Sequence, residues 1–236
     1  MKEISMDFFR DEVRNGFFIP TAVKQAWAAQ LQVLDVIETI CRKHDITYFA
    51  DWGTILGTVR HGGYVPWDDD MDICMKREDY TRFKEAAKTE LPKDFRIHDY
   101  EHQEDHWLFL SRVANSVHIN FEPEHMKQFH NFPYIAGIDI FVLDYLYKDE
   151  QQEKQRCEEV KHIIAVADSI IAGEIAQPVK EANLIQLEQK YHKTFNRKLD
   201  NRHMGIELYR LAEEQMARVP KEESDRMAQI FPWGLL

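Results

Sequence analysis

The sequence predicts an α+β fold, with a mixed β-sheet core followed by a helical lobe. The first 145 residues alternate short β-branched or aromatic segments with amphipathic stretches, which is typical of strands interleaved with helices. After Asp149 the sequence becomes almost continuously helix-favouring. With 236 residues and 44% hydrophobic residues, the chain can build one large domain or a medium domain with a smaller appendage. We therefore predict an α/β core over residues 1–148 and a helical lobe over residues 149–236.

The elements follow from the spacing of the apolar residues. Between Thr21 and His44 these recur at three- and four-residue steps, which predicts an amphipathic helix. Further helices are expected at 53–61 and 77–89, and strands at 46–50, 72–75, 95–99, 107–113, 117–121 and 138–142. Asn115-Ser116 predicts a hairpin turn between two of these strands. In the lobe we expect helices at 150–172, near 179–199, 205–218 and 221–230.

The composition excludes several classes of protein. A formal charge of −11, from 30 Lys+Arg and 41 Asp+Glu, argues against a generally basic nucleic-acid surface. Three widely separated cysteines make a poor disulfide framework and a poor zinc site, which favours a reducing cytoplasmic setting. The acidic N-terminus lacks a signal-peptide pattern, and no apolar run approaches the roughly 18 residues of a membrane span. We expect a soluble protein without an integral membrane segment.

Two aspartates flank Met71 at the start of a predicted strand. Because residues i and i+2 of a strand share a face, the carboxylates of Asp70 and Asp72 should converge. Oxygen ligands without a nearby Cys or His suit Mg²⁺, or Mn²⁺, rather than zinc. Taken alone, a solvated acidic turn, suggested by the run Asp68-Asp69-Asp70, explains Asp70 and Asp72 about equally well. Asp68 and Asp69 fit loop acids or helpers better than ligands.

A third aspartate lies inside an apolar strand pattern. Asp139 stands between Ile138 and Ile140, where a lone acid is unfavourable unless it has a partner. By itself it fits a buried hydrogen-bond network as well as it fits a metal ligand. If the two strands are neighbours, Asp139 joins Asp70 and Asp72, and such a trio suits metal-assisted attack on a phosphate.

A glycine-led helix start and several basic residues surround this motif. Gly53-Thr54 begins a helix directly after a strand, where backbone N–H groups can hold a phosphate. Neither GxxxxGK[ST] nor GxGxxG is present, so neither a Walker-type NTPase nor a Rossmann dehydrogenase is supported. Arg60 either contacts a phosphate or meets the negative end of its helix. Lys76 and Arg77 either reach a diphosphate or are surface charges at the next helix start.

The combined motif resembles the nucleotidyltransferase-fold superfamily. The fuller string GTILGTVRHGGYVPWDDDMDI, with KREDY after it and GIDIFVLD at 137–144, is more specific. It resembles the LicD family of phosphotransferases, which is similar in turn to the fukutin-type proteins. The resemblance is dense over about residues 30–145 and looser in the helical tail. It implies a nucleotidyltransferase-like sheet flanked by helices.

The resemblance also implies an activity. LicD proteins move phosphocholine from CDP-choline onto hydroxyls of cell-surface glycans. It therefore implies a CDP-alcohol donor, a glycan or lipid-linked glycan acceptor such as a lipopolysaccharide or teichoic-acid precursor, and Mg²⁺ at the site. By motif position it assigns Asp70, Asp72 and Asp139 to metal binding and catalysis, Gly53 and Thr54 to phosphate binding, and Arg112 in LFLSRVANS to a basic, substrate-binding position on a core strand.

Two alternatives stay open at this point. Nucleotidyl transfer with release of pyrophosphate would use the same three acids. The second alternative is a shortened, non-catalytic nucleotide-binding relative. Family members usually continue into a closing segment with a YGDYM-like string, whereas this sequence ends at FPWGLL. Choline, ribitol and glycerol are equally open as the transferred alcohol, and a lipid-linked acceptor would bring the protein to the inner membrane face.

Overall fold

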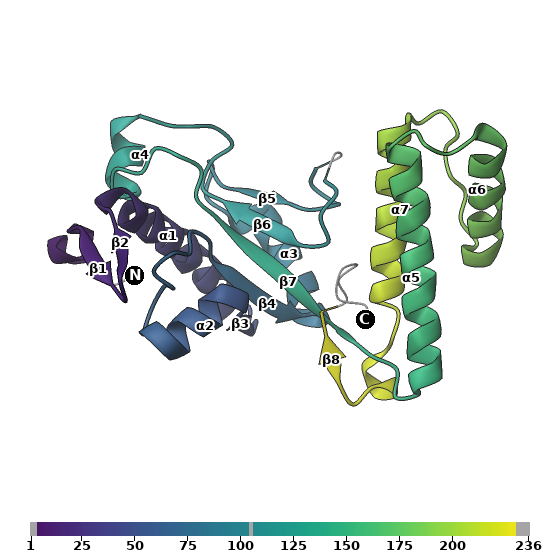
Figure 1. Ribbon diagram of the computed structural model, residues 1–236, viewed down its shortest axis with the longest axis horizontal. Helices are drawn as coiled ribbons and strands as arrows, with labels where there is room; N and C mark the ends of the chain where they lie inside the picture. Colours follow the sequence, from purple (N-terminus) through teal and green to yellow (C-terminus); the bar gives the residue numbers. More distant parts are fainter. Residues whose placement is uncertain (1–3, 104–105, 230–236) are drawn as a thin grey trace. The chain divides into compact units, whose positions relative to one another are not determined.

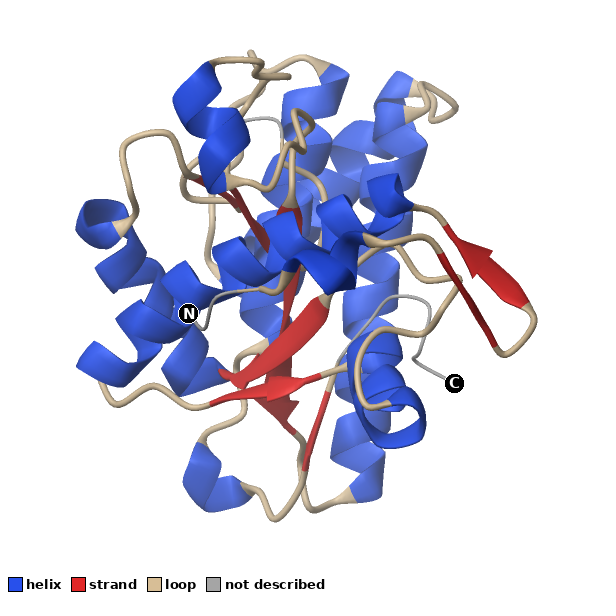
Figure 2. Cartoon of the chain, turned by 90° about the vertical axis from the view of Figure 1, so that its left-hand side faces the viewer, coloured by secondary structure: helices blue, strands red, loops and turns tan. Residues whose placement is uncertain are grey.

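The computed structural model describes residues 4–103 and 106–229, which form two compact units (Figure 1). The first unit runs to His98 and includes Leu110–Val142, and the second contains Asp99–Phe109 and the chain from Leu143 onward. About 50% of the chain is helical and 14% is strand, with a mixed sheet, which confirms the α+β class (Figure 2). The domain boundary at residue 148 stays a prediction.

A β-sheet forms the centre of the first unit. Its strand order is β3-β4-β7-β6-β5, and the pairs β3/β4, β5/β6 and β6/β7 are antiparallel. The strands are β3 (Tyr48–Ala50), β4 (Asp72–Lys76), β5 (Arg96–His98), β6 (Ser111–Ala114) and β7 (Gly137–Tyr145). The far end of β7 belongs to the second unit, where it pairs with β8 (Met227–Ala228). Because β4 and β7 are neighbours, the two aspartate-bearing strands lie side by side (Figure 1).

The hydrophobic core lies on one face of this sheet. On β4 and β7, Ile73, Ile138 and Ile140 are at most 1% exposed and join a core cluster with α1 (Thr21–Lys43) and α3 (Arg77–Glu90). The period of two along a strand then directs the residues between them to the opposite face. Asp72 and Asp139 are such residues. Helix α2 (Trp52–His61) follows β3 and contacts β4.

The N-terminal hairpin was not predicted, although the sequence carries its signal. Strands β1 (Glu12–Arg14) and β2 (Phe17–Ile19) pair across Asn15-Gly16. Both turn residues have positive φ, 53° and 79°, as an Asn-Gly hairpin turn requires. A short 3₁₀ helix (Met6–Phe9) precedes the hairpin.

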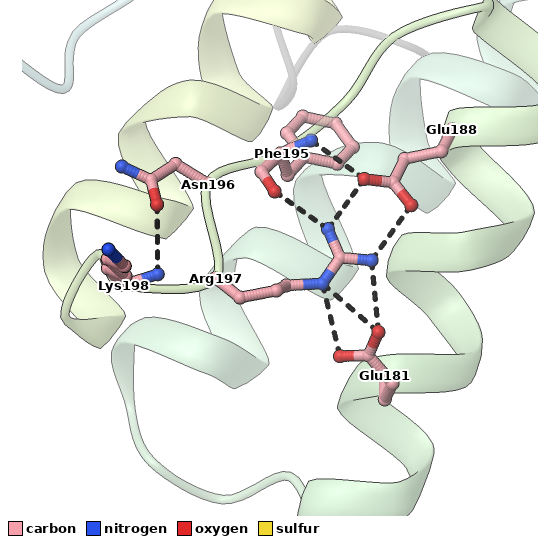
Figure 3. A network of polar contacts seen from close by, with 6 residues as sticks. All are labelled: Glu181, Glu188, Phe195, Asn196, Arg197 and Lys198. Atoms are coloured by element: carbon pink, nitrogen blue, oxygen red, sulfur yellow. Dashed lines mark hydrogen bonds and ion pairs between the residues drawn. The ribbon is translucent and has the colours of Figure 1, made fainter.

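The second unit is mainly helical. It contains α5 (Glu150–Ile171), α6 (Gln177–Tyr191), α7 (Asn201–Met216) and a 3₁₀ turn (Lys221–Glu223). Helices α5 and α7 pack so closely that a Cβ on Gly205 would lie 2.3 Å from Cγ1 of Ile171. Arg197 ties α6 to the loop after it, donating to both oxygens of Glu188 (2.6 and 2.8 Å) and to Glu181 (3.1 Å) (Figure 3). No helix in residues 4–103 and 106–229 combines the length and apolarity needed to cross a membrane.

Several element predictions were wrong. Residues 117–121 form no strand, so Asn115-Ser116 makes no hairpin; the Asn115 side chain instead accepts from the N–H of Ala136 (2.9 Å). A short helix, α4 (Pro123–Gln128), follows that segment. Strand β6 begins only at Ser111, and the helix expected at 221–230 is replaced by the 3₁₀ turn and β8. Helix α6 ends at Tyr191 because His192 adopts a left-handed conformation (φ 53°).

Candidate active site

The connection from β3 to α2 places a threonine against the acidic strand. Asp51 caps α2, its carboxylate accepting from the N–H of Trp52 (2.9 Å). Within the first turn of the helix, the Thr54 hydroxyl accepts from the N–H of Asp72 (2.8 Å), and the N–H of Asp51 donates to the carbonyl of Asp72 (3.1 Å). The start of α2 therefore fixes the start of β4.

Gly53 allows the acidic loop to approach this helix. A Cβ at Gly53 would lie 2.1 Å from Oδ2 of Asp68, so any larger side chain would displace that carboxylate. From the other side, Nε1 of Trp27 donates to the carbonyl of Asp68 (2.9 Å) and Nε2 of Gln30 donates to the carbonyl of Asp69 (2.7 Å). Two side chains of α1 thus hold the loop backbone in place.

Asp68, Asp69 and Asp70 form a compact carboxylate group. Their side-chain oxygens can all lie within 4.8 Å of one another, and within the described part of the chain no other trio of acids, His or Cys meets this distance. Burial, and then the hydrogen bond and charge of Asp70, raise the pKa of Asp68. The sequence favours loop acids or helpers at Asp68 and Asp69, and the structure places both beside Asp70.

Asp72 is the buried acid of the site, with an exposure of 8%. Burial is the main cause that raises its pKa from 3.8 to about 7, and the charges of Asp70, Asp139, Asp51 and Asp68 add to the effect. Several carboxylates close together in a partly desolvated site favour the binding of a cation. The donor set consists of carboxylate oxygens, which fits a hard divalent ion such as Mg²⁺ or Mn²⁺.

Asp139 occupies the same electrostatic environment but has its own partner. Its N–H donates to the carbonyl of Met71 (3.2 Å), which places it next to the start of β4. Its carboxylate accepts two hydrogen bonds from Arg112, Nε to Oδ1 at 2.5 Å and Nη2 to Oδ2 at 2.7 Å. The hydrogen bond with Asp139, and then the charges of Asp139, Asp70 and Asp72, raise the pKa of Arg112. Of the three aspartates predicted to bind a metal, only Asp70 belongs to the compact carboxylate group; Asp72 and Asp139 lie outside it.

The other basic residues expected at the site contact different groups. Arg60 lies in the last turn of α2, 5.7 Å from the ring of Trp67, and its Nε donates to His61 (2.8 Å). Lys76 occupies the N-cap position of α3, and Arg77 begins that helix with its guanidinium 5.4 Å from the Tyr80 ring. None of the three is among the leading charges that act on Asp72. Their role in substrate binding stays a prediction.

A comparison with known families identifies the family of this chain. Residues 45–166, just over half of the chain, match the family model described as LicD/FKTN/FKRP, nucleotidyltransferase domain. The chain belongs to the LicD family. The LicD match contains Asp70, Asp72, Asp139 and Arg112, which confirms the resemblance seen in the sequence.

Individual relatives match over shorter stretches. The chain is 43% identical over 53 residues to a lipopolysaccharide cholinephosphotransferase LicD of Haemophilus influenzae, covering 22% of this chain and 20% of that protein. Uncharacterized proteins of Rickettsia typhi and Rickettsia prowazekii are 39% and 42% identical over 54 and 48 residues, which is 23% and 20% of this chain and 18% of each relative. The matched segments thus span about a fifth of these relatives.

Sequence reasoning misses three contributors to the acidic site. Asp51 carries a readable signal, because an Asp before the first helical turn is a favoured N-cap. Trp27 and Gln30 carry no such sequence signal. They precede their partners in the acidic loop by 41 and 39 residues and reach the loop only through the tertiary fold.

Proposed function

We propose that this chain is a metal-dependent transferase that moves a phospho-alcohol group, with phosphocholine from CDP-choline as the first candidate, onto a hydroxyl of a cell-surface glycan or teichoic-acid precursor. Family membership supports the transferase class, and the similarity to the Haemophilus influenzae lipopolysaccharide cholinephosphotransferase supports the choline group. The observation that carries the proposal is the buried Asp72 carboxylate among four other acids. Such a concentration of like charge destabilises a fold unless a ligand uses it.

Asp70 and Asp72 are the residues that would hold the divalent ion, with Asp68 and Asp139 beside them. The ion would neutralise charge on the donor diphosphate as the bond to the leaving group breaks. Thr54 contributes indirectly, because its hydroxyl accepts from the N–H of Asp72 and so sets the position of that carboxylate. The first turn of α2 supplies a positive helix end for phosphate oxygens.

The remaining steps are proton transfer and alignment. An acceptor hydroxyl lying against Asp139 would pass its proton to a carboxylate oxygen as the hydroxyl oxygen attacks phosphorus. The bond from phosphorus to the bridging oxygen then breaks, and CMP leaves with that oxygen. In this mechanism the chain forms no covalent bond to substrate, and positioning together with charge neutralisation lowers the barrier.

Product analysis tests the proposal directly. The protein is incubated with Mg²⁺ and either CDP-choline, CDP-ribitol or CDP-glycerol, and the release of CMP is measured with a glycan acceptor and with water. We expect CMP from one donor, and loss of its release in Asp72→Asn. In a parallel incubation with CTP, release of pyrophosphate would instead indicate nucleotidyl transfer. Donor binding without any CMP, seen as a higher melting temperature alone, would indicate a non-catalytic relative.

A further inference from the structure

Arg112 and Asp139 form a two-pronged ion pair across neighbouring strands. The register of β6 and β7 sets the two residues directly opposite each other, on the sheet face that points away from the core. Each carboxylate oxygen accepts from a different nitrogen of the guanidinium, at 2.5 and 2.7 Å. A planar fork that engages both oxygens fixes the plane of the carboxylate as well as its place. Side-chain exposure is 13% for Asp139 and 51% for Arg112.

A glycine on β7 provides the space for this pair. Gly137 lies two residues before Asp139 and pairs with Ala114 in the register. A Cβ on Gly137 would lie 3.1 Å from Cδ and 3.2 Å from Cγ of Arg112, closer than side chains normally approach. Its φ lies outside the left-handed region that favours glycine, so the backbone itself does not require glycine here. The Arg112 side chain, which lies across the strand at this point, would have to shift by a few tenths of an ångström to admit a Cβ.

We propose that Arg112 is a positioning residue that fixes the Asp139 carboxylate toward the acidic site, and that Gly137 provides the space in which its side chain lies. This differs from the expectation that Arg112 binds the substrate. It deepens the proposed function and rests on it, since it assumes that Asp139 serves the same site as Asp70 and Asp72. The opposite relation, in which Arg112 competes with a cation for Asp139, makes the contrary prediction for metal affinity.

Mn²⁺ binding to the substrate-free protein tests the inference without turnover. Gly137→Ala changes no charge, and its Cβ would approach the Arg112 side chain most closely, so it should weaken Mn²⁺ binding, measured by calorimetry, by about tenfold. Arg112→Lys keeps the charge but loses the fork and should weaken binding similarly. Arg42→Lys, in an exposed arginine of α1, is the matched control and should bind Mn²⁺ like the wild type.

A double-mutant comparison separates the side-chain effect from a backbone effect. Once Arg112→Ala has removed the side chain, Gly137→Ala should cause almost no further loss of Mn²⁺ affinity. An equal loss in both backgrounds would overturn the inference, and so would wild-type affinity in Gly137→Ala. Tighter Mn²⁺ binding in Gly137→Ala or Arg112→Lys would show that Arg112 competes with the cation for Asp139, and would overturn the inference as well. Circular dichroism melts confirm that each variant is folded.

Turnover distinguishes this inference from the proposed function. If CMP is released from CDP-choline, Arg112→Lys should lower kcat by about tenfold or more and leave KM for the donor nearly unchanged. A raised KM with unchanged kcat would make Arg112 a donor ligand and refute the inference alone. If the wild type binds Mn²⁺ but releases no CMP, the proposed function fails and the Mn²⁺ comparison still decides the role of Arg112. A wild type that binds no Mn²⁺ refutes the inference, because there is then no metal site for Arg112 to organise.

Discussion

Replacing the buried acid of the site should stabilise the metal-free protein. Asp72→Asn keeps the shape of the side chain but removes a charge that faces Asp70, Asp139, Asp51 and Asp68. The folded-state pKa of Asp72 is raised from 3.8 to about 7, so the folded protein binds the proton more tightly than the unfolded chain does. Protonated Asp72 contributes to the free energy of unfolding. This contribution is fully present below the pKa of the unfolded state and is lost as the pH rises through the folded-state pKa of about 7.

The magnitude follows from the size of this shift. At 1.36 kcal/mol per unit, a rise of about three units corresponds to at most about 4 kcal/mol, and partial solvation of the site reduces this to roughly 2–4 kcal/mol. We therefore expect Asp72→Asn and the wild type to unfold alike near pH 4. At pH 8 with EDTA, the variant should be more stable by that amount. Added Mg²⁺ should stabilise the wild type and leave the variant unchanged.

Urea unfolding at several pH values measures this difference. Tryptophan fluorescence reports the transition, and Asp225→Asn, an exposed acid in the second unit, should unfold like the wild type. A variant that is less stable than the wild type at pH 8, or a difference that does not change with pH, would refute the reasoning. Either result would mean that the acids around Asp72 are compensated within the protein.

Three further substitutions test the packing around the site and in the second unit. Thr54→Val removes the acceptor for the N–H of Asp72 and should lower the free energy of unfolding by about 1–3 kcal/mol, together with Mg²⁺-dependent activity. Gly53→Ala should displace a carboxylate of the acidic loop, so Mn²⁺ binding should weaken while far-UV circular dichroism stays unchanged. Gly205→Ala should destabilise the α5–α7 pair by about 1–3 kcal/mol and be relieved by Ile171→Ala, because the added Cβ meets that side chain. Equal melting temperatures for Gly205→Ala and the wild type would contradict this account of the helix contact.

The best-predicted parts of the fold are those in which one strong period decides the structure. Helix α1 and strands β4 and β7 show apolar residues at regular steps, and the structure contains all three close to the expected positions. The failure at residues 117–121 has a physical cause. Val117, Ile119 and Phe121 alternate as in a strand but are 53–70% exposed, because β6 already pairs with β5 and β7 and offers no free edge. Alternation identifies a possible face, and only the sheet order shows whether a partner strand exists.

The site was predicted to the extent that it depends on local sequence. The Asp-Met-Asp alternation correctly placed Asp72 opposite the core, because faces follow from the period of two. The pairing of Arg112 with Asp139 depends on the register between strands that are 27 residues apart in sequence, which no local pattern fixes. The proximity of Asp68 to Gly53 likewise depends on how a loop returns to a helix start. Metal binding and the catalytic roles of these residues stay predictions.

The hydrogen bonds from α1 to the acidic loop have a consequence for ion selectivity. The carbonyl oxygens of residues 68 and 69 are turned toward α1, where they accept from Trp27 and Gln30, so these two carbonyls face away from the carboxylates that the loop offers an incoming ion. Calcium prefers six to eight oxygens and often recruits carbonyls, whereas magnesium is satisfied by one or two carboxylates and retains its water ligands. We expect the loop to discriminate against calcium before any substrate arrives.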